Sequence, residues 1–437
     1  MKIPQKDLSY EEVLKLPRYP HKDPVKPNLF FRSLIRLIAN GDLRDADFTY
    51  NEVRMDEAGR GPWLVLMNHS SFIDLEIASR LLYPRPYNIV TTSDGFVGKS
   101  WLMYQIGCIP TNKFVTDIGL VSDMEKALAK GSSVLMYPEA SYSFDGCATP
   151  LPRRLGILLK RLGVPVIMIT THGAFARDPL YNCLQVRKVK VSAEMKCLFT
   201  TEELRAAKSD EIDRALDEAF SFDNWRWQEE NGVEIREPFR ADGLNRILYK
   251  CPVCGREGNT EGKGTGFVCH DCGASWELDE LGRLVKDAEP DSPASASAPS
   301  LPLGFSHVPD WYAWEREEVR REIEAGTYCT ETEVEIRMMV DMKAIYRVGT
   351  GTLRHDCDGF HLIGSDGEDG AGRALEFTQP PRACYSCYSD YYWYEIGDMV
   401  CIGTKDCLYY CFPAKKDVVA KIRLATEEMF KMMKGKK

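Results

Sequence analysis

The chain has 437 residues and a formal net charge of −9 at pH 7. Its residues are 44% hydrophobic and 28% charged, which is typical of a globular protein and excludes a collagen-like or wholly disordered chain. A chain of this length has room for about two to four domains. The acidic balance argues against bulk electrostatic binding to nucleic acid or to anionic lipid.

Apolar stretches in the chain are short, such as Trp63–Met67, whereas a membrane-spanning helix needs roughly 18–20 apolar residues. The first residues, Met1–Asp7, lack the apolar region of a secretory signal. The chain contains 15 cysteines. In a long chain without a secretory signal, these indicate free thiols and metal ligands rather than a disulfide framework. We therefore expect a protein of the reducing cytoplasm.

The first predicted element is an amphipathic helix that begins after Asn28, its N-cap, and runs to Gly41. At ~1.5 Å per residue it is about 20 Å long, too short to cross a bilayer. Two interpretations stay open: a helix that lies on anionic lipid, or an ordinary helix packed on its domain. Its basic edge and apolar face consist of Arg32, Arg36, Phe30, Leu34, Leu37 and Ile38.

Strand-like and helix-like segments alternate over residues 1–240. This pattern predicts an α/β domain with a mixed, largely parallel sheet and helices on both faces. The expected strands are Trp63–Met67, Tyr87–Thr92, Ser133–Tyr137 and Val164–Thr171. The expected helices are Phe72–Leu82, Phe96–Ile106, Ile118–Ala129 and Leu155–Leu162. Ligands of such sheets tend to bind at the carboxyl ends of the strands.

His69 directly follows one of these strands, and Asp74 falls in the first turn of the next helix. A carboxylate at that position can reach back to one imidazole nitrogen, so that the other nitrogen can take a proton from a substrate hydroxyl. Local alternatives exist, because Ser71 and Asp74 are spaced as in a capping box and His69 could be a hydrogen-bonded core histidine. A second His-x4-Asp pair, at His361, lies in a Gly/Asp-rich region without a following helix, and we do not assign it a function.

Four segments, which we call the first to fourth blocks in chain order, resemble the sequence blocks of the glycerolipid acyltransferase superfamily, of which lysophosphatidic acid acyltransferase is typical. The resemblance covers roughly residues 25–200. Four short blocks in the correct order are far more specific than any one of them. The four segments are Asn68–Asp74, Gly107–Lys113, Tyr137–Ser143 and Val164–Ile167.

The resemblance implies that His69 is the general base of a direct transfer and that Asp74 orients it. The acceptor hydroxyl then attacks an acyl thioester, supplied by acyl-CoA or acyl-carrier-protein, without a covalent acyl-enzyme. The remaining implied residues shape the His69 loop, bind the acceptor or close the site. They are Asn68, Ser70, Gly107, Pro110, Lys113, Glu139 and Ser141.

Two positions depart from the pattern of the family. Lys113 stands where an arginine is common, and Tyr142 stands where the family has the arginine expected to hold a phosphate. Lysine can still meet a phosphate, but as a point charge rather than a bidentate fork. Arg153 and Arg154 either restore phosphate binding or form a solvated face. The identity of the acceptor therefore stays open.

Two cysteine pairs at Cys251, Cys254, Cys269 and Cys272 predict a zinc ribbon over residues 245–285. Four thiolates suit tetrahedral Zn²⁺ and leave no open position for water, so the zinc is expected to be structural. Ribbons often contact nucleic acid or protein, but acidic residues in and after the second pair disfavour nucleic acid.

A Pro/Ser/Ala-rich linker is expected over residues 286–306, followed by a β-rich domain over 307–437. Strands followed by one C-terminal helix, Asp417–Met433, resemble a pleckstrin-homology or GRAM-type module. Cys384 and Cys387 lack a second cysteine pair at metal-binding spacing and are expected to be strand thiols.

Together these features predict a 1-acylglycerol-3-phosphate O-acyltransferase-like enzyme of phospholipid biosynthesis. Its acceptor would be a lysophospholipid or a glycerol-phosphate-type hydroxyl, and it would be peripheral to the inner face of the cell membrane. Two alternatives stay open: a lipid- or acyl-binding pseudoenzyme, and a regulator linked to nucleic acid through the ribbon. The oligomeric state is not predicted.

Overall fold

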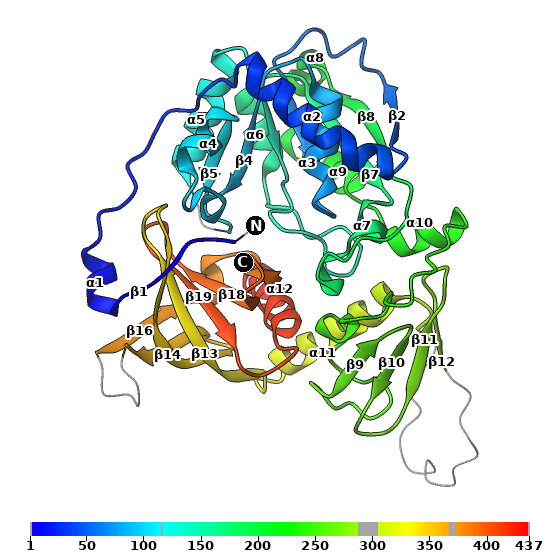
Figure 1. The fold of residues 1–437 in the computed structure, drawn as a ribbon, viewed down its shortest axis with the longest axis vertical. Helices are drawn as coiled ribbons and strands as arrows, with labels where there is room; N and C mark the ends of the chain where they lie inside the picture. The colour runs from blue at the N-terminus through cyan, green and yellow to red at the C-terminus, as the bar shows by residue number, and fades with distance from the viewer. Residues whose placement is uncertain (1, 115–116, 287–304, 367–372, 436–437) are drawn as a thin grey trace.

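The computed structural model describes residues 2–114, 117–286, 305–366 and 373–435. Most of the expected linker, residues 286–306, lies outside the described residues. Figure 1 shows an α/β part at the top, a strand-rich part with a long helix below it, and a small sheet at the lower right.

A seven-stranded sheet forms the centre of the α/β part, in the order β2-β8-β7-β3-β6-β4-β5. All neighbouring strands are parallel except β7 and β8, which are antiparallel. The sequence prediction of a mixed, largely parallel sheet is therefore confirmed. The strands are β2 (Thr49–Val53), β3 (Leu64–Met67), β4 (Tyr87–Thr92), β5 (Cys108–Thr111), β6 (Ser133–Met136), β7 (Val166–His172) and β8 (Ser192–Phe199).

Helices cover both faces of this sheet because alternate side chains of each strand point to opposite faces. Val65 and Met67 of β3 pack into a core with α2 and α3, while Leu64 and Leu66 pack into a second core with α5, α6 and α9. The helices of this part are α2 (Leu29–Asp45), α3 (Ile73–Leu82), α4 (Ser100–Gln105), α5 (Ile118–Ala129), α6 (Leu155–Leu162), α7 (Ala174–Arg177), α8 (Thr201–Ala206), α9 (Ser209–Ala219) and α10 (Asn224–Glu230), with the short η1 (Ser93–Phe96) and η2 (Leu180–Asn182) between them.

Helix α2 begins where the sequence predicts, since the Asn28 side chain accepts from the Phe31 backbone N–H at 3.1 Å. It ends at Asp45 rather than at Gly41. The extra turn carries Leu43, which is buried in the core against the sheet and so holds the end of the helix in place. No helix of the described residues combines the length and apolar composition needed to span a bilayer.

Residues 244–286 form η3 and a four-stranded antiparallel sheet in the order β12-β11-β10-β9. Strands β9 and β10 form a hairpin at the glycine-rich stretch between the two cysteine pairs. The elements are η3 (Leu244–Arg246), β9 (Thr260–Lys263), β10 (Gly266–Cys269), β11 (Ser275–Leu278) and β12 (Leu284–Lys286).

The C-terminal part is strand-rich, as expected, and its sheet has the order β16-β15-β14-β13-β19-β18-β17. The N-terminal strand β1 (Gln5–Asp7) joins this sheet by pairing in parallel with β14, so it lies apart from the α/β domain to which the sequence analysis assigns it. A short helix, α1 (Tyr10–Lys15), follows it. The other elements are α11 (Val308–Glu324), β13 (Cys329–Met339), β14 (Ile345–Asp356), β15 (Gly359–Ser365), β16 (Ala374–Gln379), η5 (Pro381–Ala383), β17 (Tyr388–Trp393), β18 (Gly397–Gly403), β19 (Leu408–Pro413) and α12 (Val419–Gly435).

One continuous hydrophobic core joins the three parts of the chain. It contains Phe144 of the α/β part, Trp276 of the small sheet, and Trp311 and Ile422 of the C-terminal helices. The C-terminal part therefore packs on the loops of the α/β part rather than hanging from a linker. In Figure 1, α12 lies directly below the α/β part.

Candidate functional site

The imidazole of His69 lies at the carboxyl end of β3, in the loop that leads into α3. Its Nδ1 is 3.1 Å from Asp74 Oδ2. The His69 side chain is 20% exposed and that of Asp74 is fully buried, so a substrate can reach the histidine but not the acid. The two residues that the sequence singles out are thus brought together in the orientation that general-base chemistry requires.

Backbone donors fix the carboxylate of Asp74. Its Oδ2 accepts from the N–H groups of Ser70 and Ser71 at 2.8 and 3.0 Å, and Thr171 Oγ1 lies 3.5 Å from Oδ1. The bond from Ser71 N–H is half of the expected capping box, but no side-chain hydrogen bond caps α3. Because a carboxylate accepts, His69 Nδ1 carries the proton and Nε2 keeps its lone pair.

Burial lowers the pKa of His69, because it disfavours the charged imidazolium. The hydrogen bond and charge of Asp74 act in the opposite direction, and the charge of Lys113 lowers the pKa further. The imidazole is therefore in its neutral, basic form at pH 7.

Two tyrosine rings enclose the imidazole. The centroid of Tyr137 lies 4.0 Å from that of His69 at an interplanar angle of 26°, and that of Tyr142 lies 4.1 Å away at 31°. Both faces of the imidazole are covered, so a substrate hydroxyl must approach its edge. Sequence analysis treated Tyr142 only as a missing arginine and did not predict this contact.

Glu139 holds the backbone of the His69 loop. Its Oε1 accepts from the His69 N–H at 3.0 Å, and its Oε2 accepts from the N–H and hydroxyl of Thr149 at 2.8 and 2.9 Å. Burial raises the pKa of Glu139 to about 7. In this arrangement Glu139 joins the first and third blocks.

Asn68 and Ser70 are fully buried and shape the same loop. Asn68 Oδ1 accepts from the Thr171 N–H at 2.8 Å, and its amide nitrogen donates to the Ser70 hydroxyl at 3.2 Å. These bonds tie the loop to β7. His172, the next residue of β7, stacks on Trp227 at 5.6 Å and takes no part in the site.

The second block runs along β5. Asn88 Nδ2 donates to the Gly107 carbonyl at 2.8 Å, and Pro110 is half-buried within the strand. Lys113 lies beyond the strand, with its Nζ 4.2 Å from the ring centroid of Tyr388 in β17. Ser141 is buried and accepts from Arg423 Nη2 of α12 at 2.9 Å.

The C-terminal part thus contributes to the surroundings of the second and third blocks. Tyr388 and Arg423 were not predicted as site residues, and Arg423 is separated from Ser141 by 282 positions. The dense aromatic stretch around β17 is visible in the sequence, but nothing in its spacing indicates which surface it covers. Arg153 and Arg154 line a separate cavity of about 660 Å³ together with Asp213 and Asp217.

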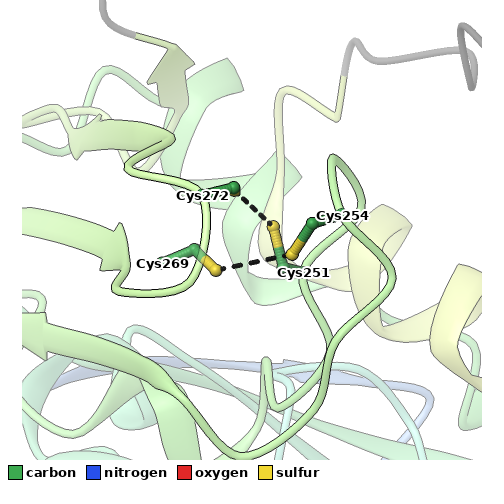
Figure 2. Close-up of side chains that lie close together, drawn as sticks. All are labelled: Cys251, Cys254, Cys269 and Cys272. Carbon is green, nitrogen blue, oxygen red and sulfur yellow. Dashed lines mark hydrogen bonds between the residues drawn. The ribbon is translucent and has the colours of Figure 1, made fainter. Parts of the chain in front are cut away.

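A second site lies in the small sheet, where four cysteine side chains converge (Figure 2). All four Sγ atoms lie within 4.8 Å of one another, with contacts of 3.7 Å between Cys251 and Cys272 and 3.8 Å between Cys254 and Cys269. A tetrahedron with Zn–S bonds of ~2.3 Å has edges of about 3.8 Å. The four thiols therefore fit a tetrahedral zinc ion.

The turns of this site need glycine after each cysteine pair. Gly255 and Gly273 have φ values of +73° and +74°, which L-residues with side chains rarely adopt. By contrast, Cys401 and Cys411 are buried thiols of β18 and β19. Cys384 and Cys387 were expected in a strand, but they lie in the loop between η5 and β17, where Cys387 is buried and Cys384 half-buried.

Residues 49–172 match the family model described as Acyltransferase. The His69 loop lies within this matched segment. The chain is also 28% identical over 116 residues to a 1-acyl-sn-glycerol-3-phosphate acyltransferase, BAT2, chloroplastic, from Brassica napus. That match covers 26% of this chain and 33% of the relative, so the chain spans about a third of the length of the curated relative it matches.

A solved structure with detectable similarity is the 1-acyl-sn-glycerophosphate (LPA) acyltransferase PlsC from Thermotoga maritima. The match covers 43% of this chain and 78% of that chain, with 14% sequence identity and a TM-score of 0.31. At this TM-score the likeness carries no argument. The family-model match lies within the α/β part of the chain and includes neither the small sheet nor the C-terminal part.

Proposed function

We propose that the chain transfers a fatty acyl group from acyl-CoA or acyl-carrier-protein to a hydroxyl of a lysophospholipid or glycerol-phosphate-type acceptor. The observation that carries this proposal is the contact of 3.1 Å between His69 Nδ1 and Asp74 Oδ2 inside the matched segment. The similarity to the Brassica napus 1-acyl-sn-glycerol-3-phosphate acyltransferase supports the class of acceptor.

In the proposed reaction, His69 Nε2 takes the proton of the acceptor hydroxyl as its oxygen attacks the thioester carbonyl. The C–S bond breaks, the ester forms, and the imidazolium returns the proton to the leaving thiolate. Asp74 stabilises the imidazolium between the two steps. Cys108 is an unsuitable nucleophile, because it is buried and burial raises the pKa of its thiol to about 12.

Peripheral contact with the inner face of the cell membrane is part of the proposal. Five apolar side chains of α2 are exposed, and Trp101, 70% exposed, packs edge-on against Phe31 of the same helix at 6.3 Å. An apolar helix face beside basic residues suits insertion between lipid headgroups. The five side chains are Leu29, Phe30, Leu34, Leu37 and Ile38.

We further propose that the four cysteines hold a structural zinc ion. Bound as thiolates, Cys251, Cys254, Cys269 and Cys272 would fill all four positions of its coordination sphere. The ion would join the loop before β9 to the turn after β10.

The decisive experiment incubates the full-length protein with each acyl donor and a panel of lysolipids, and follows both thioester consumption and the lipid products. We expect His69→Ala to lower the rate by on the order of 10²- to 10⁴-fold. His361→Ala is a matched control, because it removes the histidine of the second His-x4-Asp pair, which lies on β15, and should leave the rate unchanged. Equal rates for wild type and His69→Ala would overturn the enzyme assignment in favour of a lipid-binding pseudoenzyme.

A further inference from the structure

A buried arginine of the C-terminal helix α12 lies against the loop of the third block. Arg423 is 3% exposed, donates from Nη2 to Ser141 Oγ at 2.9 Å, and lies 4.2 Å above the ring of Phe144. Ser141 directly precedes Tyr142, whose ring covers the imidazole of His69. The guanidinium is therefore attached to the same short loop that encloses the general base.

The hydrogen-bonding capacity of Arg423 is only partly used. Its Nε donates to Glu427 at 3.2 Å, but Nη1 is buried and has no hydrogen-bond partner among the described residues. An arginine offers five N–H donors, and a buried donor without a partner is destabilising because it has lost its hydrogen bonds to water. Glu427 is moreover shared with Arg316, whose Nη1 lies 2.7 Å from it, so one carboxylate serves two guanidinium groups.

A second cation, Lys113, lies near the site. Lys113 of the second block is half-buried, and no ion pair of Lys113 within 4 Å occurs in the described part of the chain. Burial lowers the pKa of Lys113, the charges of Asp390 and Asp94 act in the opposite direction, and the charge of Arg423 lowers the pKa further. Lysine and arginine with free donors are the groups that proteins use to bind phosphate.

The acidic side chains around Lys113 and Arg423 neutralise the positive charge of these two residues only in part. Asp390 of β17 and Glu139 face Lys113 and Arg423 respectively, and burial raises the pKa of each to about 7. Both are therefore substantially protonated near neutral pH. Asp94 also faces Lys113; its Oδ2 accepts from the hydroxyl of Tyr388 and from the indole N–H of Trp393 at 3.3 Å, whereas its buried Oδ1 has no hydrogen-bond partner among the described residues.

We propose that Arg423, supplied by the C-terminal helix, is a specificity-determining residue that together with Lys113 binds an anionic group of the acyl acceptor, of the phosphate class. The inference rests on the proposed function and deepens it. The acceptor site then consists of two parts of the chain, and the strand-rich part is a component of the enzyme rather than an accessory module.

The test compares two acceptors with the same acyl chain: lysophosphatidic acid, which carries a phosphate, and monoacylglycerol, which does not. For Arg423→Gln we expect the KM for lysophosphatidic acid to rise on the order of 10- to 100-fold, with kcat changed far less and monoacylglycerol kinetics unchanged. Arg423→Lys keeps the charge and should recover part of the affinity. Lys421→Gln is the matched control, because it also removes a buried cation of α12 but one that pairs with Glu257 and Glu322, away from the loop.

An equal loss on both acceptors would overturn the proposal, since it would mean that Arg423 only holds the loop in place. If Arg423→Gln fails to fold, the wild-type protein and Arg423→Lys supply the test through their melting temperatures. Glycerol 3-phosphate should raise the wild-type value more than glycerol does, and the difference should shrink in Arg423→Lys. No difference in the wild type would also overturn the proposal. Absence of acyl transfer to every acceptor would instead remove the proposed function, and the melting experiment would still test anion binding.

Discussion

The two tyrosine rings around His69 determine how its imidazole can meet a substrate. With Tyr137 and Tyr142 at 4.0 and 4.1 Å on its two faces, only the Nε2 edge is left for a hydroxyl. The rings also exclude water, and the resulting desolvation keeps the imidazole neutral. Access and basicity of the general base thus have the same physical cause.

This environment predicts the pH dependence of the reaction. Burial holds the pKa of His69 below its ordinary value of 6.5, and only the unprotonated imidazole is a base, so kcat/KM should rise with pH through an apparent pKa below 6.5. Asp74→Asn removes the carboxylate that raises the pKa of His69, so this limb should move to lower pH while the rate falls by roughly 10²- to 10⁴-fold. The measurement is kcat/KM against pH for both proteins.

Glu139 titrates in a neighbouring range, since its pKa is raised to about 7. Its hydrogen bonds go to His69 N–H and Thr149, and none goes to Asp74, so a limb that belongs to Glu139 would not move in Asp74→Asn. A limb that stays in place, or moves to higher pH, would contradict the assignment of His69 as the base.

At the scale of elements, α2 has one buried face and one exposed apolar face, which suit the two interpretations that the sequence left open. Its Ala39 and Leu43 are buried against the α/β core, whereas Leu37 and Ile38 are each 69% exposed. One face therefore holds the helix on the domain and the other is available to lipid. An amphipathic helix can pack on its domain through one face and still present the other face for the proposed contact with lipid, because the two faces point in different directions.

Replacing the exposed face should weaken membrane contact without unfolding the helix. The double variant Leu37→Glu/Ile38→Glu should bind vesicles containing anionic lipid at least about tenfold more weakly in a sedimentation assay, because burying a large apolar side chain contributes about 1.5–3 kcal/mol. Ile157→Glu, an exposed position on α6, is the control and should bind as wild type does. Unchanged binding of the double variant would assign the membrane contact to another surface.

At the scale of the whole molecule, α12 links the cysteine site to the loop that carries Ser141. Lys421 Nζ lies 2.9 Å from Glu257, a residue between the two cysteine pairs in the sequence, and 2.8 Å from Glu322 of α11. Arg423 of the same helix, α12, donates a hydrogen bond to Ser141. The shared core packs Trp276 of the small sheet against Trp311 of α11 at 4.9 Å. A change at the cysteine site should therefore affect the whole chain.

Metal removal tests this coupling. We expect about one zinc per chain by elemental analysis and its loss in Cys272→Ser, with a fall in melting temperature of about 5 °C or more because metal binding contributes to folding free energy. Acyl-transfer activity should fall with it, since α12 loses support. Cys329→Ser replaces an exposed thiol outside the cluster and should change neither quantity. A metal-free wild type with the same melting temperature in the presence of a chelator would refute the zinc proposal.

Much of the α/β part, and the pairing of His69 with Asp74, was predictable from the sequence. Strand β4 and helices α5 and α6 begin and end where the hydrophobic pattern predicts. Burial of one face of a strand or helix makes hydrophobic residues recur at a regular spacing along the sequence. His69 and Asp74 are five positions apart, and a strand end followed by a helix start brings such residues together by backbone geometry alone. The same reason applies to the cysteine pairs, each confined to a single turn.

Only the tertiary structure decided which distant surfaces meet. The pairing of β1 with β14, the tyrosines on the two faces of His69 and the bond from Arg423 to Ser141 all depend on how separately buried surfaces fit together. Such contacts leave no periodic signal, since the positions that make them are ordinary members of their own elements. The His69–Asp74 pair and the cysteine pairs can therefore be recognised in the local sequence, whereas the contact between the C-terminal helix and Ser141, 282 positions away, follows from tertiary packing.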